Sequence, residues 1–121
     1  MFSQFIPAES TEQQPDAKLQ IWAKLVLIVR KDVDNNKYSQ DTNLNEVIIR
    51  NYVKNIGVDA FFQCTNIKKV TFEGLNTKIQ ICAFDGCTGL KTLTLPSQLE
   101  EIPDGMCRNC VALTRLTIPN S

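Results

Sequence analysis

Residues 79–96 read IQICAFDGCTGLKTLTLP, and the same pattern recurs at residues 56–72 and 102–119. The three copies are in phase, each beginning 23 residues after the previous one. Cysteines mark this phase at Cys64, Cys87 and Cys110. A fixed period of about 20–50 residues is the signature of a stacked-repeat solenoid. The sequence therefore predicts repeats that each contact only their neighbours in the stack.

A Leu-x-x-Leu-x-Leu spacing within each copy predicts a short strand. Alternate side chains of a strand lie on the same face, so Leu93 and Leu95 are expected in the core while Thr92 and Thr94 face out. Strands of successive repeats stack side by side as a parallel sheet. The Ala-Phe-x-x-Cys segment is expected to form a short helical turn on the opposite face. These features predict a right-handed solenoid of about four strands.

Three segments divide the chain. Residues 1–18 are polar and proline-containing, and we expect a flexible N-terminal arm there. Residues 19–43 are expected to form an N-terminal cap with a first, irregular strand. Tyr38 lies one period before Phe61, so the pattern extends weakly into this cap. Residues 44–121 carry the regular repeats.

The chain resembles the BspA-like (Treponema-type) leucine-rich repeat family. The resemblance rests on the pattern Ile79-x-x-x-Ala83-Phe84-x-x-Cys87-x-x-Leu90-x-x-Leu93-x-Leu95-Pro96 and its copies at 56–72 and 102–119. It implies a leucine-rich repeat solenoid of the α/β type. Such repeats occur in bacterial surface proteins and in proteins of parasitic protists. One function that the resemblance implies is therefore a structural or cell-surface adhesive protein of a bacterium or protist.

Charge and hydropathy exclude several partners. Lys+Arg and Asp+Glu both number 13, which leaves no net charge and argues against nucleic acid or an anionic membrane. The longest apolar run, residues 25–29, is too short to span a bilayer. Residues 1–7 lack the basic and apolar regions of a secretion signal. We therefore expect a cytoplasmic or nuclear location, with the cysteines as thiols.

Residue types that carry catalysis are scarce. The chain has no histidine, which removes Ser-His-Asp and Cys-His catalysis and the usual zinc-ligand sets. Its five glycines form no phosphate-binding loop. The adjacent carboxylates Glu100 and Glu101 are expected on a solvated turn. The sequence predicts a protein that is not an enzyme and holds no cofactor or metal.

Four of the cysteines follow the core phase of the repeat. Free cysteine is a small, commonly buried residue, so Cys64, Cys87 and Cys110 are expected in the core. Cys107 takes the place of the phenylalanine of the earlier copies, so the repeat sets both ends of its C-x-x-C pair with Cys110. Cys82 is out of phase with the core. It is the cysteine we expect to be open to oxidation or an intermolecular disulfide.

A second resemblance concerns Lys68, Lys69, Val70, Thr71 and Phe72. This segment resembles the R-V-x-F docking motif of protein phosphatase 1 regulators. The resemblance implies a partner-binding site in which an extended strand adds to a sheet edge of the catalytic subunit. It predicts a regulatory subunit of that phosphatase. The repeat itself also demands apolar residues at 70 and 72, which it points into the solenoid.

An uncovered last repeat predicts self-association. Solenoids normally need a polar cap on each end, and the fourth strand is followed only by Pro119-Asn120-Ser121. The exposed edge of the last strand and the uncovered apolar side chains of the last repeat favour association with a second copy of the chain. We expect a homo-oligomer, a dimer or trimer.

Overall fold

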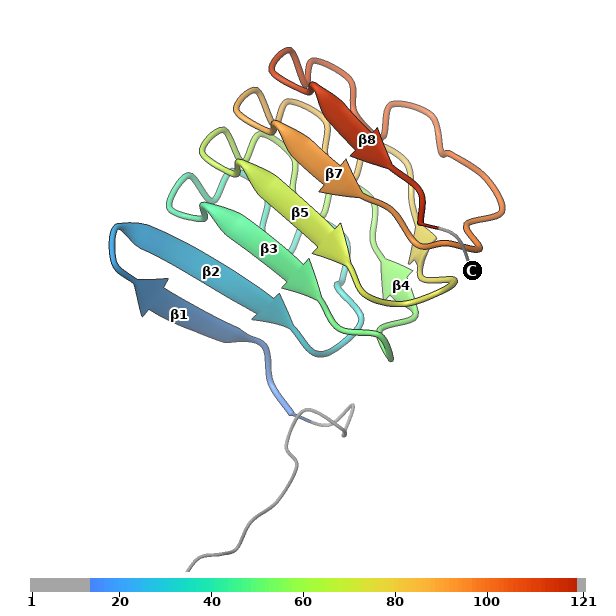
Figure 1. Ribbon diagram of the computed structural model, residues 1–121, viewed down its shortest axis with the longest axis horizontal. Helices are drawn as coiled ribbons and strands as arrows, with labels where there is room; N and C mark the ends of the chain where they lie inside the picture. Colours follow the sequence, from blue (N-terminus) through green and yellow to red (C-terminus); the bar gives the residue numbers. More distant parts are fainter. Residues whose placement is uncertain (1–13, 120–121) are drawn as a thin grey trace, which may run out of the picture.

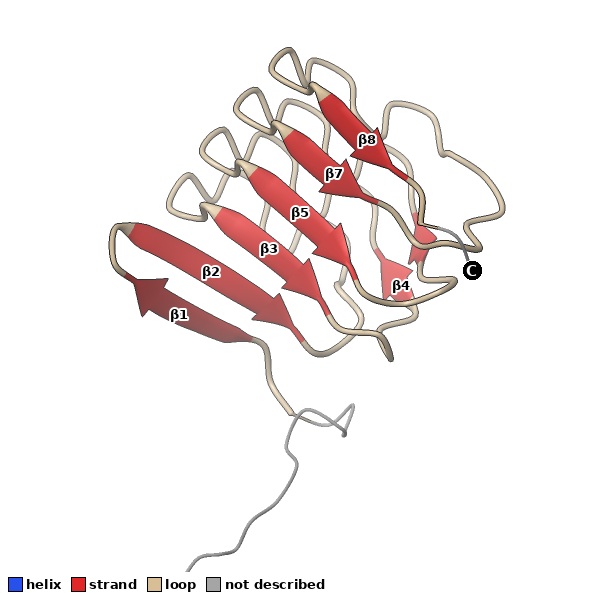
Figure 2. Ribbon diagram, viewed as in Figure 1, coloured by secondary structure: helices blue, strands red, loops and turns tan. Residues whose placement is uncertain are grey.

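The computed structural model describes residues 14–119, which form a solenoid of short strands joined by turns (Figure 1). Along the chain the strands are β1 (Ala17–Ile21), β2 (Lys24–Val29), β3 (Glu46–Ile49), β4 (Asn55–Ile56), β5 (Lys69–Phe72), β6 (Lys78–Ile79), β7 (Thr92–Thr94) and β8 (Arg115–Thr117). Within residues 14–119 there is no helix (Figure 2). Most of the expected N-terminal arm, residues 1–13, lies outside the described residues.

Six strands form one sheet in the order β1-β2-β3-β5-β7-β8. From β2 onward all neighbours are parallel, and the register pairs residues one period apart, such as Val47 with Val70 and Val70 with Leu93. β4 and β6 form a second, two-stranded parallel sheet. The predicted leucine-rich repeat solenoid is therefore confirmed. β1 is an addition that the repeat did not predict, and it pairs antiparallel with β2.

One face of the large sheet forms the core. Its buried side chains occupy alternate positions of successive strands, namely Leu27, Val29, Val47, Ile49, Val70, Phe72, Leu93 and Leu95. This alternation is the period-two pleat of a strand. Full burial of an apolar side chain of this size is worth ~1.5–3 kcal/mol. Apolar burial between neighbouring repeats therefore holds the stack together.

The opposite face is built of turns, which corrects the expectation of short helical turns. Each Ala-Phe-x-x-Cys region contains two residues with positive φ, in the pairs Asp59 and Gln63, Cys82 and Gly86, and Gly105 and Asn109. Left-handed residues cannot continue a right-handed helix. Their backbone groups bond to the next repeat instead. The Gln63 N–H donates to the Asp85 carbonyl at 2.8 Å, for example.

Two ladders run through the turns. The rings of Tyr38, Phe61 and Phe84 stack with centroid distances of 5.4 and 5.3 Å. The Cys64 thiol donates to the Tyr38 carbonyl at 3.0 Å, and the Cys87 thiol donates to the Phe61 carbonyl at 3.1 Å. Both thiols are fully buried, which confirms their predicted place in the core.

The two ends of the described solenoid differ. At the N-terminal end, Asp16 accepts a hydrogen bond from the Tyr38 hydroxyl at 2.5 Å, and the Lys18 ammonium lies 5.9 Å from the centre of the Tyr38 ring. At the C-terminal end, three residues expected in the core are about half exposed: Ile102 (54%), Leu116 (52%) and Ile118 (56%). No further repeat covers these three within residues 14–119.

Candidate binding surface

β5 carries the residues of the predicted phosphatase-docking site. Val70 is fully buried and Phe72 is 3% exposed, so both point into the core as the repeat pattern predicts. Thr71 is half-buried, while Lys68 and Lys69 are exposed. β5 lies between β3 and β7 and is hydrogen-bonded to both. The structure therefore presents the two lysines of this site to solvent but not its two apolar anchors.

The outer face of the large sheet brings together residues from six strands. Strand register places them in two rows. One row contains Leu19, Val26, Glu46, Lys69, Thr92 and Arg115. The other contains Ala17, Ile28, Ile48, Thr71, Thr94 and Thr117. Side chains directly opposite each other on paired strands share a face and contact one another. The first row therefore changes from apolar to charged or polar at Glu46 on β3, and the second changes at Thr71 on β5.

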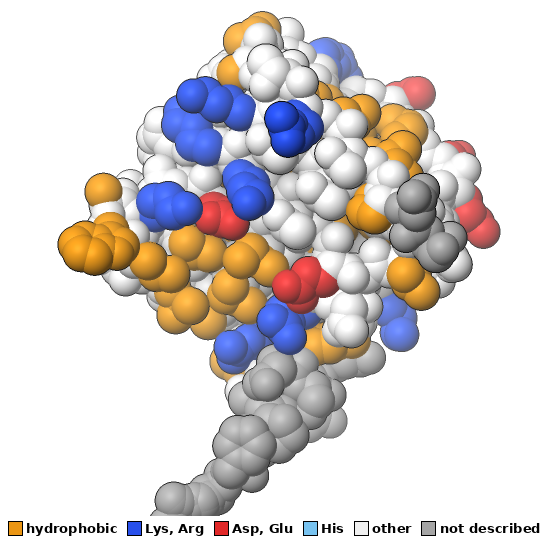
Figure 3. All heavy atoms as spheres, viewed as in Figure 1, with side chains coloured by type: hydrophobic (Ala, Val, Ile, Leu, Met, Phe, Trp, Pro, Cys, Tyr) orange, Lys and Arg blue, Asp and Glu red, His pale blue; other side chains and the backbone are white. Residues whose placement is uncertain are grey.

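The apolar half of this face is a continuous patch over β1–β3 (Figure 3). Leu19 and Ile21 are 44% and 45% exposed, beside the half-buried Ile28 and Ile48, whereas Val26 is buried. Trp22 stands in the tight turn between β1 and β2 and is 95% exposed. The Gln20 side chain donates to the Trp22 carbonyl at 2.9 Å and so restrains this turn. Contiguous apolar surface on a soluble protein marks an interaction site, and tryptophan is enriched at interfaces.

The polar half of the outer face is basic. Four cations gather where β5, β7 and β8 begin: Lys68, Lys69, Lys91 and Arg115 (Figure 3). None of the four makes an ion pair with a described residue. Glu46, the one acidic residue in the two rows, already pairs with Lys24 at 3.1 Å. This end of the face therefore carries uncompensated positive charge despite the neutral chain.

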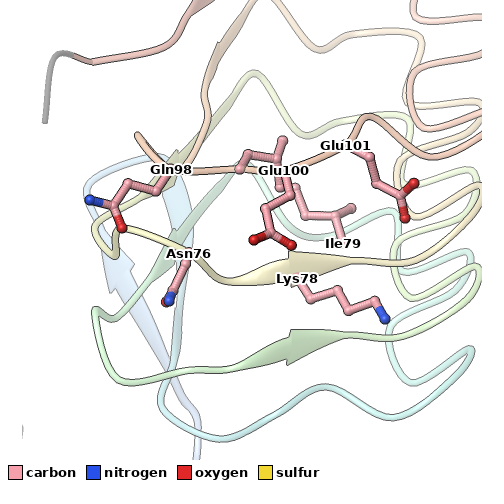
Figure 4. A pocket seen from close by; sticks show the side chains of 7 residues that line it. Asn76, Lys78, Ile79, Gln98, Glu100 and Glu101 are labelled. Atoms are coloured by element: carbon pink, nitrogen blue, oxygen red, sulfur yellow. The ribbon is translucent and has the colours of Figure 1, made fainter.

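A separate hollow of about 290 Å³ lies between the second and third repeats, away from this face (Figure 4). Glu100, Glu101 and Lys78 are among its lining residues. The side chains of Glu100 and Glu101 point in different directions (Figure 4). Such an arrangement gives the two carboxylates no common target to act on as acid and base.

Residues 14–119 contain no group of three or more cysteine, aspartate or glutamate side chains placed to hold a metal ion. No helix among the same residues is long and apolar enough to cross a bilayer.

Sequence reasoning identified the outward positions but not the apolar half. The prediction of a polar outer face came from the copy at residues 79–96, where Thr92 and Thr94 face out. The signal for the apolar half lies earlier, in the alternation of apolar residues at Leu19 and Ile21 and again at Val26 and Ile28. This alternation precedes the regular repeats, so the period of 23 residues does not reveal it.

The fold defines a leucine-rich repeat solenoid that presents a parallel sheet. Residues 31–121 match the model of the BspA type leucine rich repeat region in six copies. The chain therefore belongs to the BspA-type leucine-rich repeat family. No curated protein sequence matches it.

Two solved structures share this fold. The leucine rich repeat protein of T. pallidum (TpLRR) is similar with a TM-score of 0.58 and 17% identity, over 88% of this chain and 70% of that protein. A leucine rich cell surface protein from Faecalibacterium prausnitzii is similar with a TM-score of 0.52 and 18% identity, over 87% of this chain and 41% of that one.

The expected cytoplasmic or nuclear location is wrong. The BspA-type family and the neighbour described as a cell surface protein point to a surface or extracellular protein. The expectation rested on the absence of a secretion signal in the first seven residues, and that absence does not locate the protein.

Proposed function

We propose that this chain is a non-enzymatic protein-binding module of a surface or extracellular protein, and that it binds through the outer face of its large sheet. One observation carries the proposal. An apolar patch with the 95% exposed Trp22 lies on the same face as four cations that form no ion pair with residues 14–119. Leucine-rich repeats of this family support protein interaction or surface adhesion in general.

The chemistry of this face determines the kind of partner. Tryptophan and other large apolar side chains supply the anchors of protein interfaces. Uncompensated lysine and arginine attract carboxylates and speed the encounter with them. The partner is therefore a protein segment that presents apolar side chains beside aspartate or glutamate.

A synthetic peptide of alternating acidic and apolar residues provides the test. It should bind the wild type, whereas the same peptide with lysine in place of each acidic residue should not. Trp22→Ser, and separately Lys69→Glu with Arg115→Glu, should each weaken binding about tenfold or more. Val111→Ser and Lys78→Glu are matched controls outside the outer face and should leave binding unchanged.

Three outcomes would overturn the proposal. The acidic peptide fails to bind, both peptides bind equally, or the control variants weaken binding as much as the variants of the outer face. Vesicles of anionic phospholipid are the remaining probe. If they displace the peptide and bind more tightly than it does, the face serves a membrane rather than a protein.

Regulation of protein phosphatase 1 stays a prediction, and the surface-protein function has the better support. Docking through the R-V-x-F-like segment would require Val70 and Phe72 to leave the core, together with the hydrogen bonds of β5 to two neighbours. A pull-down with the phosphatase catalytic subunit tests it. The prediction requires capture by the wild type and loss with Lys68→Ala and Lys69→Ala, which are surface changes that spare the fold.

A further inference from the structure

The third turn of the solenoid contains a pair of thiols where the other turns contain an aromatic ring and a thiol. In each turn the N–H of the cysteine donates to the carbonyl three residues earlier. The distance is 3.2 Å from Cys64 to Phe61, 3.2 Å from Cys87 to Phe84 and 3.1 Å from Cys110 to Cys107. The repeat therefore holds the same backbone geometry in all three turns, and only the third has sulfur at both positions.

This backbone geometry suits a disulfide. A turn closed by a hydrogen bond across three residues brings its terminal Cα atoms within about 7 Å. Disulfides join residues whose Cα atoms are about 4.4–6.8 Å apart. The two side chains also lie close enough for each to change the pKa of the other. The Cys110 thiol donates to the Phe84 carbonyl at 3.2 Å, a bond that it gives up when a disulfide forms. Forming a bond between the two sulfurs requires rotation of side chains and little movement of the backbone.

Cys107 and Cys110 are more exposed than the cysteines of the earlier turns, and their pKa values are shifted in opposite directions. Cys64 and Cys87 are fully buried, whereas Cys107 and Cys110 are half-buried. The hydrogen bond from Cys107 lowers the pKa of the Cys110 thiol, and the same bond together with burial raises the pKa of Cys107. Cys110 is therefore the sulfur that more readily becomes a thiolate, which is the reactive form.

We propose that Cys107 and Cys110 form a dithiol site that a small disulfide oxidises to an intramolecular disulfide. The Cys110 thiolate attacks one sulfur of the oxidant and displaces a small thiolate, which takes up a proton. The Cys107 sulfur then loses its proton and attacks Cys110 in this mixed disulfide, displacing the second small thiol. Two protein thiols are oxidised and one small disulfide is reduced to two thiols, so atoms and electrons balance.

The remaining half-buried cysteine provides an internal control. The Arg108 guanidinium donates to the Cys82 sulfur at 3.2 Å, and the residue three positions after Cys82 is Asp85 rather than a second cysteine. Under the same oxidant it should form at most a mixed disulfide or a link between chains. Loss of Cys82 should leave the proposed bond unaffected.

Tryptic mapping of the whole chain tests the site. The reduced, folded chain is treated with oxidised glutathione, and its free thiols are then blocked with N-ethylmaleimide before unfolding and digestion. Trypsin cleaves after Lys91, Arg108 and Arg115, so peptides 92–108 and 109–115 separate when the thiols are free. The expected product is these two peptides joined, without maleimide on either cysteine. Dithiothreitol should separate them.

Two variants establish the assignment. Cys107→Phe restores the residue that the repeat uses at this position, so it removes one thiol while keeping the turn filled. It should abolish the link, and Cys82→Ser should not. Oxidation should also raise the melting temperature of the wild type by a few degrees and leave that of Cys107→Phe unchanged. Maleimide on both cysteines of the wild type after oxidation, or a link from either to Cys82 or Cys87, would overturn the proposal.

Discussion

The second and third turns of the solenoid share a backbone and differ in what fills it. In the second turn, Phe84 is fully buried and stacks on Phe61 at 5.3 Å. In the third, Cys107 occupies the corresponding position, is only half-buried, and ends the aromatic stack. The hydrogen bonds from one turn to the next continue nevertheless, as from the Phe84 N–H to the Met106 carbonyl at 3.0 Å. Backbone geometry and side-chain packing are therefore specified separately in this repeat.

The largest effect should come from removing the stack where it is complete. Phe84→Ala should lower the free energy of unfolding by ~3–5 kcal/mol, because it leaves a cavity at a fully buried site. Cys107→Ala changes the corresponding position one turn later. It removes only a sulfur atom from a half-buried site, so it should cost less than about 1 kcal/mol. Urea unfolding under reducing conditions measures both. Equal losses would mean that packing at the third turn matters as much as at the second.

Alkaline pH should reveal the buried thiol of Cys64 through the stability of the chain. Burial raises the pKa of Cys64 from 9.0 to about 11. Between these values the unfolded chain loses a proton that the folded chain retains, so stability falls as pH rises. A shift of this size corresponds to a loss of about 2–3 kcal/mol, complete near pH 11.

Cys64→Ala is the comparison for the alkaline prediction. Its unfolding free energy should fall less than that of the wild type over the same range, because Cys64 no longer contributes. Cys87, whose pKa burial also raises, should still give the variant a slope. Parallel curves for the two proteins would show that Cys64 is not protected from ionisation.

At the other end of the aromatic stack, Asp16 covers Tyr38. The Asp16 carboxylate accepts hydrogen bonds from the Tyr38 hydroxyl and from the backbone N–H groups of Arg30 and Lys31. Asp16→Ala should cost about 1–2 kcal/mol, because these donors lose their partner. Lys18→Ala changes a more exposed neighbour of the same ring and should cost much less. Thermal unfolding of the two variants compares them, and equal melting temperatures would contradict this role for Asp16.

Homo-oligomerisation to a dimer or trimer stays a prediction. Among the described strands β8 pairs only with β7, and its Leu116 is 52% exposed. Light scattering of the 121-residue chain tests it. A strict monomer at high concentration would contradict the prediction, whereas a Leu116→Ser variant that dissociates an oligomer would place its interface at this end.

Periodicity predicted the parts of the structure that repeat. Leu93 and Leu95 are buried because strand alternation and the period of 23 residues act together on them. The turns were less visible, because the left-handed position is a glycine at Gly105 but aspartate at Asp59 and cysteine at Cys82. Hydrogen bonds to the next repeat stabilise that conformation, and they do not leave a residue-type signal in a single copy.

Features outside the period could not be predicted from it. β1 pairs antiparallel with β2, so no residue of β1 has a counterpart one repeat later. The apolar half of the outer face follows from this strand and from Ile28 and Ile48, which replace the threonines of later repeats. The basic half was also missed, because a zero net charge does not report how charges are distributed.

The smallest expected effect comes from extending the stack into the third turn. Cys107→Phe would place a ring next to Phe84 in a backbone that already holds Phe61 and Phe84 in stacked positions. Aromatic pairs contribute ~0.5–1.5 kcal/mol beyond the burial of their area. The gain should be below about 1 kcal/mol, because this position is half-buried and the ring would remain partly in water.

Cys107→Leu is the matched variant for that substitution, since it adds apolar volume without a ring to stack. A urea midpoint that rises for Cys107→Phe and rises less for Cys107→Leu would show that stacking is what the third turn lacks. A fall in both would place the cause in Met106, which is 4% exposed where the earlier repeats have Ala60 and Ala83. Its longer side chain would then already occupy the space of the missing ring, and a phenylalanine beside it would overpack the turn.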